Sequence, residues 1–118
     1  MPGLSIHVVD VSRGVVGTGM QVALHRCGDG GKLDQIMEGA IGAAGLLEAP
    51  ELATIFPAGR YLVLFHVGDF YRRAGIKLPA VPFLDVVQFA FGISDPGQHY
   101  HLPFKCTPWG FSCFRGGA

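Results

Sequence analysis

Histidines stand out among the residues of this sequence that can do chemistry near neutral pH. His7 interrupts an apolar stretch near the start, and His99 and His101 lie two positions apart near the end. Side chains of an extended strand alternate between two faces, so His99, His101 and Lys105 share one face. A positioned imidazole gives or takes a proton and contributes about 10²- to 10⁴-fold to a rate. The pattern predicts acid/base chemistry by His7 and His101, provided that the two ends of the chain meet.

Lys105 adds a positive charge to this face. An ammonium group beside imidazoles stabilises negative charge on a carbonyl oxygen, and a lysine also forms Schiff bases with aldehydes or ketones. Two other interpretations stay open. In the first, the histidines are solvent-exposed strand residues without a chemical role. In the second, His7, His99 and His101 bind zinc, as a His-x-His pair with a third histidine does in catalytic sites. We expect no metal, because further ligands are scattered, and no nucleotide cofactor, because Walker A and GxGxxG motifs are lacking.

The three cysteines predict thiols rather than disulfides. Cys27, Cys106 and Cys113 form no CxxC pair and leave an odd number, which fits a reducing compartment. Cys106 follows Lys105, and nearby cations favour a thiolate nucleophile. Alternation turns Cys106 to the face opposite Lys105, so we expect it in the core.

Length and composition predict one domain over residues 1–118. Charged residues are only 15% and the apolar set is 49%, too few polar side chains to cover a monomer, so we expect a homo-oligomer. Nine basic residues balance nine acidic ones, without a basic cluster, which argues against nucleic-acid or membrane partners. The start lacks a signal-peptide pattern, so we expect a cytoplasmic protein with a small-molecule substrate.

Short apolar runs between turn residues predict an all-β antiparallel sandwich of seven to eight strands with one short helix. The helix is expected over 70–74, capped by Asp69 and ended by Gly75. The expected strands cover residues 4–11, 20–26, 32–38, 60–67, 82–93, 99–105 and 109–115.

A family resemblance rests on three segments, and the likeness runs in the same order over nearly the whole chain. They are His7-Val8-Val9-Asp10 with Gly14 after it, Gly68-Asp69-Phe70-Tyr71, and the ending from His99-Tyr100-His101 to Phe114-Arg115-Gly116. In this order they resemble the transthyretin-related family, whose enzymatic members are 5-hydroxyisourate hydrolases. The resemblance implies a two-sheet sandwich in a homotetramer, a dimer of dimers whose central channel holds the active sites.

In those hydrolases, a histidine of the opening motif, an arginine of an Asp-Gly-Arg turn, the second histidine of His-Tyr-His and a terminal Tyr-Arg-Gly-Ser act without metal on a cyclic ureide. The resemblance assigns the two histidine roles to His7 and His101, and Arg115-Gly116 matches part of the tail. Two segments differ: the turn reads Ala44-Gly45-Leu46, and the tail reads Phe114-Arg115-Gly116-Gly117. Lys105 stands where the family has an apolar residue.

The sequence therefore predicts a divergent enzyme of the 5-hydroxyisourate hydrolase type. We expect His7 and His101 as base and acid and Lys105 as the stabiliser of an oxyanion. The expected substrate-binding residues are Leu46, Ser112, Phe114 and Arg115. The reaction is a hydrolytic ring opening of a small cyclic or carbonyl substrate, or a cyclase, isomerase or lyase step, in purine breakdown or a specialised pathway. The alternative is a non-catalytic small-molecule carrier of the transthyretin type.

Overall fold

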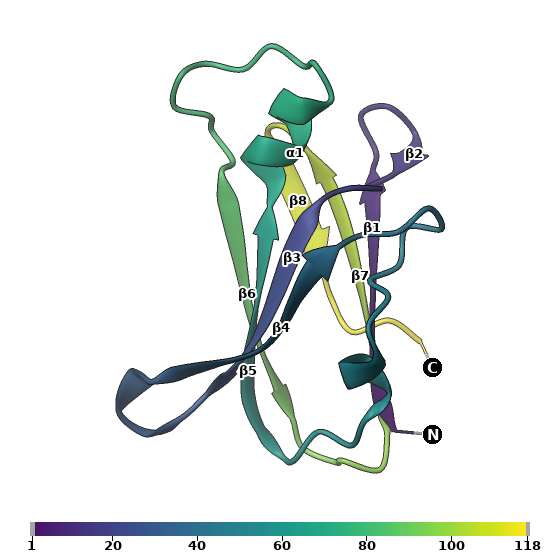
Figure 1. Ribbon diagram of the computed structural model, residues 1–118, viewed down its shortest axis with the longest axis vertical. Helices are drawn as coiled ribbons and strands as arrows, with labels where there is room; N and C mark the ends of the chain where they lie inside the picture. The colour runs from purple at the N-terminus through teal and green to yellow at the C-terminus, as the bar shows by residue number, and fades with distance from the viewer. Residues whose placement is uncertain (1, 118) are drawn as a thin grey trace.

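Two four-stranded sheets face each other in the computed structural model, which describes residues 2–117 (Figure 1). The first sheet has the strand order β2-β1-β7-β8, and the second has the order β4-β3-β5-β6. The strands of the first sheet are β1 Gly3–Asp10, β2 Val15–Val16, β7 His99–Thr107 and β8 Gly110–Cys113. Those of the second are β3 Gln21–Cys27, β4 Leu33–Ala40, β5 Gly59–His66 and β6 Val86–Ile93. The expected all-β sandwich is confirmed.

One strand pairing departs from the expected antiparallel arrangement. β1 and β7 run parallel, with Gly3 opposite His99 and Asp10 opposite Cys106. The chain completes the whole second sheet between these two strands, and its return sets their relative direction. Alternation of apolar residues reports which face a side chain takes, but it carries no information on whether distant neighbours run parallel.

The core lies between the sheets, where one face of each strand is apolar. Leu4, Ile6 and Val8 of β1 are buried, whereas the residues between them reach the opposite face of the sheet. Phe65 of β5 and Phe104 of β7 stack with their ring centroids 3.8 Å apart, joining the two sheets. This packing fixes β1 and β7 from the inside, so their outward residues sit on a rigid base.

The short helix is present, but its start differs from the expectation. α1 spans Val67–Arg73, so Asp69 lies within its first turn rather than at its cap, and His66 takes the cap position without a side-chain hydrogen bond. The helix begins earlier because Val67, Phe70 and Tyr71 are buried against the core. Gly75 follows with φ +81°, the expected left-handed exit. Two short 3₁₀ turns, η1 Asp29–Gly31 and η2 Pro50–Ala53, complete the elements.

The expected strands are present with shifted limits. The largest shift is in β6, which begins at Val86 and not at residue 82, because the preceding stretch belongs to the loop after α1 (Figure 1). β8 is also shorter than expected and ends at Cys113. None of the helices within residues 2–117 is long and apolar enough to cross a membrane.

A buried carboxylate ties the helix to the end of β1. Asp10 is 0% exposed and accepts hydrogen bonds from the Tyr71 hydroxyl at 2.7 Å and from Arg13 Nε at 2.6 Å. The Ser12 backbone and hydroxyl donate to the same carboxylate. Burial alone raises the pKa of Asp10, but these hydrogen bonds and the charge of Arg13 outweigh it, so the net pKa lies below its ordinary value. The carboxylate therefore stays ionised and holds β1 in place.

Candidate functional site

The outer face of the β1–β7 pair gathers the histidines from the two ends of the chain. In the parallel register, Ser5 lies opposite His101, and His7 lies opposite Pro103. The alternating residues that both strands turn outward are half-buried, except Lys105, which is exposed. His7 and His101 are therefore diagonal neighbours on adjacent strands. The two ends meet as expected.

Ser5 lies between two imidazole rings. Its hydroxyl oxygen is 2.6 Å from His101 Nδ1 and 2.9 Å from His99 Nε2. His99 Nδ1 in turn lies 3.4 Å from the backbone carbonyl oxygen of Pro2. The group of His7, Ser5, His99 and His101 is called the histidine cluster below.

The protonation of His101 is adjusted by its surroundings. Burial lowers the pKa of His101 below its ordinary value, and the neighbouring imidazoles of His7 and His99 lower it further. Both effects disfavour a positive charge on this ring. His101 is therefore neutral over a wider pH range than a free histidine, which suits a group that accepts a proton near neutral pH.

The loop segment that contains Gly45 and Leu46 pairs with β1 beside His7. Leu46 forms an isolated antiparallel bridge with His7, and flanking backbone hydrogen bonds run from Val8 N to Gly45 O and from Leu47 N to Ile6 O. Leu46 is 37% exposed beside the imidazole. Gly45 has φ +80°, and a Cβ atom there would lie 2.8 Å from His7 Nε2. Only glycine allows the loop to approach the ring this closely.

The chain end passes along the other side of the cluster. Gly116 N donates to His101 O at 2.7 Å, and a Cβ atom at Gly116 would lie 2.8 Å from His101 Cδ2. Ser112 pairs with Lys105 across β7 and β8, and Lys105 is exposed on the outer face. Its ammonium nitrogen lies 5.8 Å from the centroid of the Phe114 ring. Lys105, Ser112 and Phe114 thus form one group, four residues along β7 from His101.

The distance along β7 separates the lysine from the imidazoles. Four residues of extended strand cover about 13 Å, so Lys105 and His101 flank a shared surface and do not contact each other directly. Phe114 lies between the pairs Lys105–Ser112 and His101–Gly116, and the ammonium contacts it there. A ligand that contacts both Lys105 and His101 would therefore lie over Phe114 and Pro103.

Arg115 does not join this group. Its guanidinium lies 3.8 Å from the centroid of the Tyr100 ring and donates to Gln98 Oε1 and to His99 O. Tyr100 is buried on the inward side of β7. Arg115 thus fastens the chain end to β7.

A hollow of about 510 Å³ opens beside Ser5 and His99. Most of its lining is apolar, with Leu46 on the side of His7 and polar groups from Ser5, Glu48 and His99. The remaining lining residues are Pro2, Leu4, Leu47, Ala49, Leu52 and Ala53. The histidine cluster therefore borders a space with the volume of a small-molecule site.

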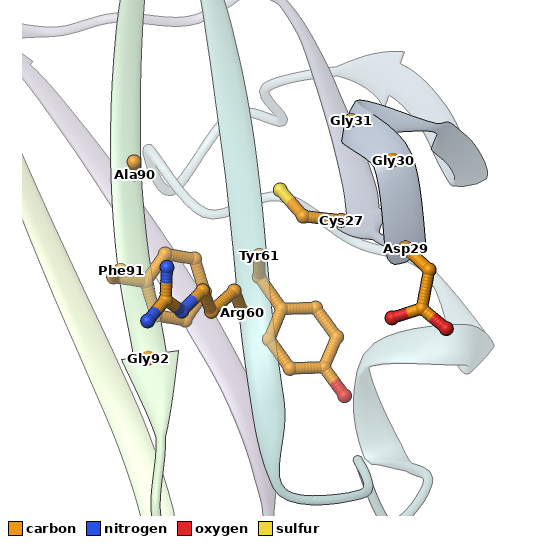
Figure 2. Close-up of a pocket in the computed structure, with 10 residues that line it drawn as sticks. Cys27, Asp29, Gly30, Gly31, Arg60, Tyr61, Ala90, Phe91 and Gly92 are labelled. Carbon is orange, nitrogen blue, oxygen red and sulfur yellow. The ribbon is translucent and has the colours of Figure 1, made fainter.

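A second hollow, of about 850 Å³, lies on the other sheet. Figure 2 shows it between Cys27 at the end of β3, Asp29 in the turn that follows, and strands β5 and β6, which contribute Arg60 and Phe91. It contains no histidine. The volume alone would favour this hollow, but the group of histidines brought together by β1 and β7 lies at the first sheet, so we place the candidate site there.

Two of the earlier alternatives can be compared with this geometry. Among the residues described, 2–117, no group of three histidine, cysteine or acidic side chains is arranged to share a metal ion. Cys106 is buried as expected, and burial raises the pKa of its thiol to about 11, so it does not supply a thiolate at neutral pH. Within residues 2–117, the three cysteines are thiols that form no disulfide.

Sequence reasoning missed three residues of the site. The contacts of Ser5 with His99 and His101 depend on the β1–β7 register, which no local pattern gives. Gly45 and Gly116 matter because they leave room for His7 and His101. The glycine of the Ala44-Gly45-Leu46 turn was visible in the sequence, but nothing local indicated that Gly116 meets His101.

Comparisons with known proteins agree with the fold. The model of the HIUase/Transthyretin family matches residues 4–116. A 5-hydroxyisourate hydrolase of Ralstonia nicotianae is 38% identical over 117 residues, covering 98% of this chain and 99% of the relative.

Solved structures give the same result. The 5-hydroxyisourate hydrolase of Klebsiella pneumoniae has a TM-score of 0.81 at 32% identity, covering 99% of this chain and all of that one. An (S)-allantoin synthase has a TM-score of 0.88 at 32% identity, and 98% of this chain matches 43% of its length. Sea bream transthyretin in complex with thyroxine has a TM-score of 0.85 at 24% identity over 98% of this chain and 96% of its own, a likeness of fold alone.

Proposed function

Because the chain belongs to the HIUase/Transthyretin family, we propose that it is a hydrolase-like enzyme that opens a small cyclic, carbonyl-containing substrate. The observation that carries the proposal is the meeting of His7 and His101 on the outer face of β1 and β7. Two imidazoles on one surface provide both an acceptor and a donor of protons near neutral pH.

The two imidazoles divide the work as base and acid. His101, whose pKa is lowered, takes a proton from a water molecule, and the water oxygen attacks the substrate carbonyl carbon. The electron pair of the carbonyl moves onto its oxygen and returns as the ring carbon–nitrogen bond breaks. His7 gives its proton to the leaving nitrogen. The products together contain the substrate plus one water, and the two histidines have exchanged protonation states.

Lys105 supplies positive charge for the carbonyl oxygen. The ammonium acts as a point charge, and its contact with Phe114 directs it over the surface between β7 and β8. Ser112 is its neighbour across the strands and offers a hydroxyl for a hydrogen bond to the ligand. A substrate that uses all these groups extends along β7 from His101 toward Lys105.

Leu46 indicates a substrate that differs from 5-hydroxyisourate. In the 5-hydroxyisourate hydrolases that this chain resembles, the turn carries an arginine, whose guanidinium can make two parallel hydrogen bonds to a planar ureide. Loss of such a contact costs about 2–5 kcal/mol. Leu46 instead borders the mostly apolar hollow of about 510 Å³. We therefore propose that the substrate of this chain has an apolar portion that lies in this hollow.

We also propose that the chain works as a homotetramer with the site in a channel between subunits. Several large apolar side chains are exposed on the monomer, among them Leu46, Phe111 and Phe114 on or beside the first sheet. Exposed apolar groups of this kind favour association. Light scattering of the purified protein tests this proposal: a mass of four chains supports it, and a monomer contradicts it.

A substrate panel tests the proposed function. Cyclic ureides, imides and lactams, with and without apolar substituents and including 5-hydroxyisourate, are incubated with the protein in water enriched in oxygen-18. We expect ring-opened products that contain one labelled oxygen, formed faster from substituted rings. Compounds that bind and are recovered unchanged would support the carrier alternative and contradict the hydrolase.

A further inference from the structure

The hydroxyl of Ser5 can donate only one hydrogen bond, yet it lies within hydrogen-bond distance of two imidazole nitrogens. The contacts are His101 Nδ1 at 2.6 Å and His99 Nε2 at 2.9 Å. If Ser5 donates to one ring, the other ring must carry a proton on the contacting nitrogen and donate to the Ser5 oxygen. The direction of these two hydrogen bonds therefore decides which nitrogen of His101 is protonated.

The contact of His99 with Pro2 sets the direction of these hydrogen bonds. His99 Nδ1 lies 3.4 Å from the backbone carbonyl oxygen of Pro2, which can only accept a hydrogen bond. Although this contact is long, it favours a proton on Nδ1, because an unprotonated Nδ1 would place its lone pair against those of the oxygen. A neutral His99 with its proton on Nδ1 has an accepting Nε2. Ser5 then donates to His99, and its oxygen accepts from His101 Nδ1.

We propose that Ser5 is a positioning residue that, together with His99, holds neutral His101 with its proton on Nδ1. The Nε2 atom of His101 then carries the free lone pair and is the atom that accepts a proton from water. This inference rests on the proposed function for its catalytic meaning, but the tautomer itself is a property of the protein without substrate. His99 thereby gains a role that does not require contact with the substrate.

The surroundings of His101 fit this arrangement. His7 from β1 and His99 from β7 are the ionisable side chains that act on its charge, and both disfavour protonation of the ring. The charge of Arg115, from the chain end, is directed to Tyr100, and that of Lys105 lies farther along β7. The hydrogen bond at Nδ1 is thus the strongest polar contact found for the ring, and it fixes both tautomer and orientation.

Nitrogen-15 NMR of the imidazoles tests the proposal directly. Spectra of the full chain without substrate, at about pH 8 where histidine is ordinarily neutral, report which nitrogen of His101 carries the proton. We expect Nδ1–H in the wild type. In Ser5→Ala the ring loses its partner and the fraction with the proton on Nε2 rises. In Ser5→Thr, which keeps the hydroxyl, the wild-type tautomer is retained.

His99→Leu gives an independent variant. Without an acceptor at His99, the Ser5 hydroxyl is free to donate to His101 Nδ1, so the fraction of His101 with its proton on Nε2 is expected to rise. A wild-type spectrum with the proton on Nε2, or a tautomer unchanged in both Ser5→Ala and His99→Leu, would overturn the proposal. Backbone amide spectra of the same samples show that the variants are folded.

Kinetics separate this inference from the proposed function. With a panel compound that the wild type hydrolyses, Ser5→Ala is expected to lower kcat by roughly tenfold, the lower end of what loss of a histidine-orienting group costs in metal sites, with little change in KM. Ser5→Thr restores kcat. If no compound is hydrolysed, the proposed function fails while the tautomer result still stands. If hydrolysis proceeds and Ser5→Ala changes neither tautomer nor kcat, the positioning role alone fails.

Discussion

Gly116 offers a test of how closely the rate depends on the placement of His101. A Cβ atom at this position would lie 2.8 Å from His101 Cδ2, about 0.6 Å short of the 3.4 Å at which ordinary contact begins. Pro103 blocks the other side, with Cγ at 3.1 Å and Cδ at 3.3 Å. The imidazole is the softer neighbour, so we expect Gly116→Ala to displace it. A misplacement of about 1 Å costs about 10²-fold in rate, and the smaller shift predicts a loss of about tenfold or more.

Gly117→Ala is the matched control, because a Cβ atom there meets nothing within 4 Å. The assay compares kcat of both variants on a compound that the wild type hydrolyses, together with the chemical shifts of the His101 ring. We expect a lower kcat and altered ring shifts in Gly116→Ala only, with thermal unfolding close to that of the wild type. Altered ring shifts with an unchanged kcat would refute the reasoning that His101 must be held in place for catalysis.

Three further predictions follow from other parts of the chain. Leu46→Arg should raise turnover of 5-hydroxyisourate by about thirtyfold or more, the equivalent of about 2 kcal/mol, and should lower turnover of rings with apolar substituents. Leu46→Lys lacks the paired donors and should gain less in the same assay. The lowered pKa of His101 predicts that kcat rises with pH along a limb whose apparent pKa is below about 6.5, and a limb above that value would contradict its assignment as the base. Tyr71→Phe removes a buried donor to Asp10 and should reduce the free energy of unfolding by about 1–3 kcal/mol in urea titrations, whereas an unchanged midpoint would show that the hydroxyl is dispensable.

The same carboxylate gives the pH dependence of stability a definite sign. The folded-state pKa of Asp10 lies below its ordinary value of about 3.9. Its contribution is therefore complete above that value and is lost as the pH falls through the lower, folded-state pKa. Loss of the Tyr71 hydroxyl raises the pKa of Asp10, so Tyr71→Phe should begin acid unfolding at a higher pH than the wild type.

The sequence predicts well which face of a strand a side chain occupies, but it predicts poorly which strands lie side by side. Alternation along the strand predicts that Cys106 faces the core, and Cys106 is buried there. Alternation cannot give register, and Ser5 and His101 are 96 positions apart in the chain. The parallel pairing that brings them together arises from packing of the whole sandwich, which no local pattern contains.

The helix and the chain end illustrate the same limit. Asp69 has the residue type of a cap, but burial of Val67 and Tyr71 extends the helix past it. The match to the tail of related hydrolases predicts that Arg115 binds substrate, and the structure adds that its guanidinium stacks on Tyr100. A match in sequence position predicts where the backbone of a residue lies, but it does not predict where its side chain points.

The central claim is that His7 and His101 carry out the proton transfers of one reaction. The most direct measurement is the single-turnover rate of the best panel substrate for the wild type, His7→Ala, His101→Ala and the double variant. We predict a loss of about 10²- to 10⁴-fold for each single change and a double loss smaller than the product of the two. Unchanged rates in both single variants would contradict the account.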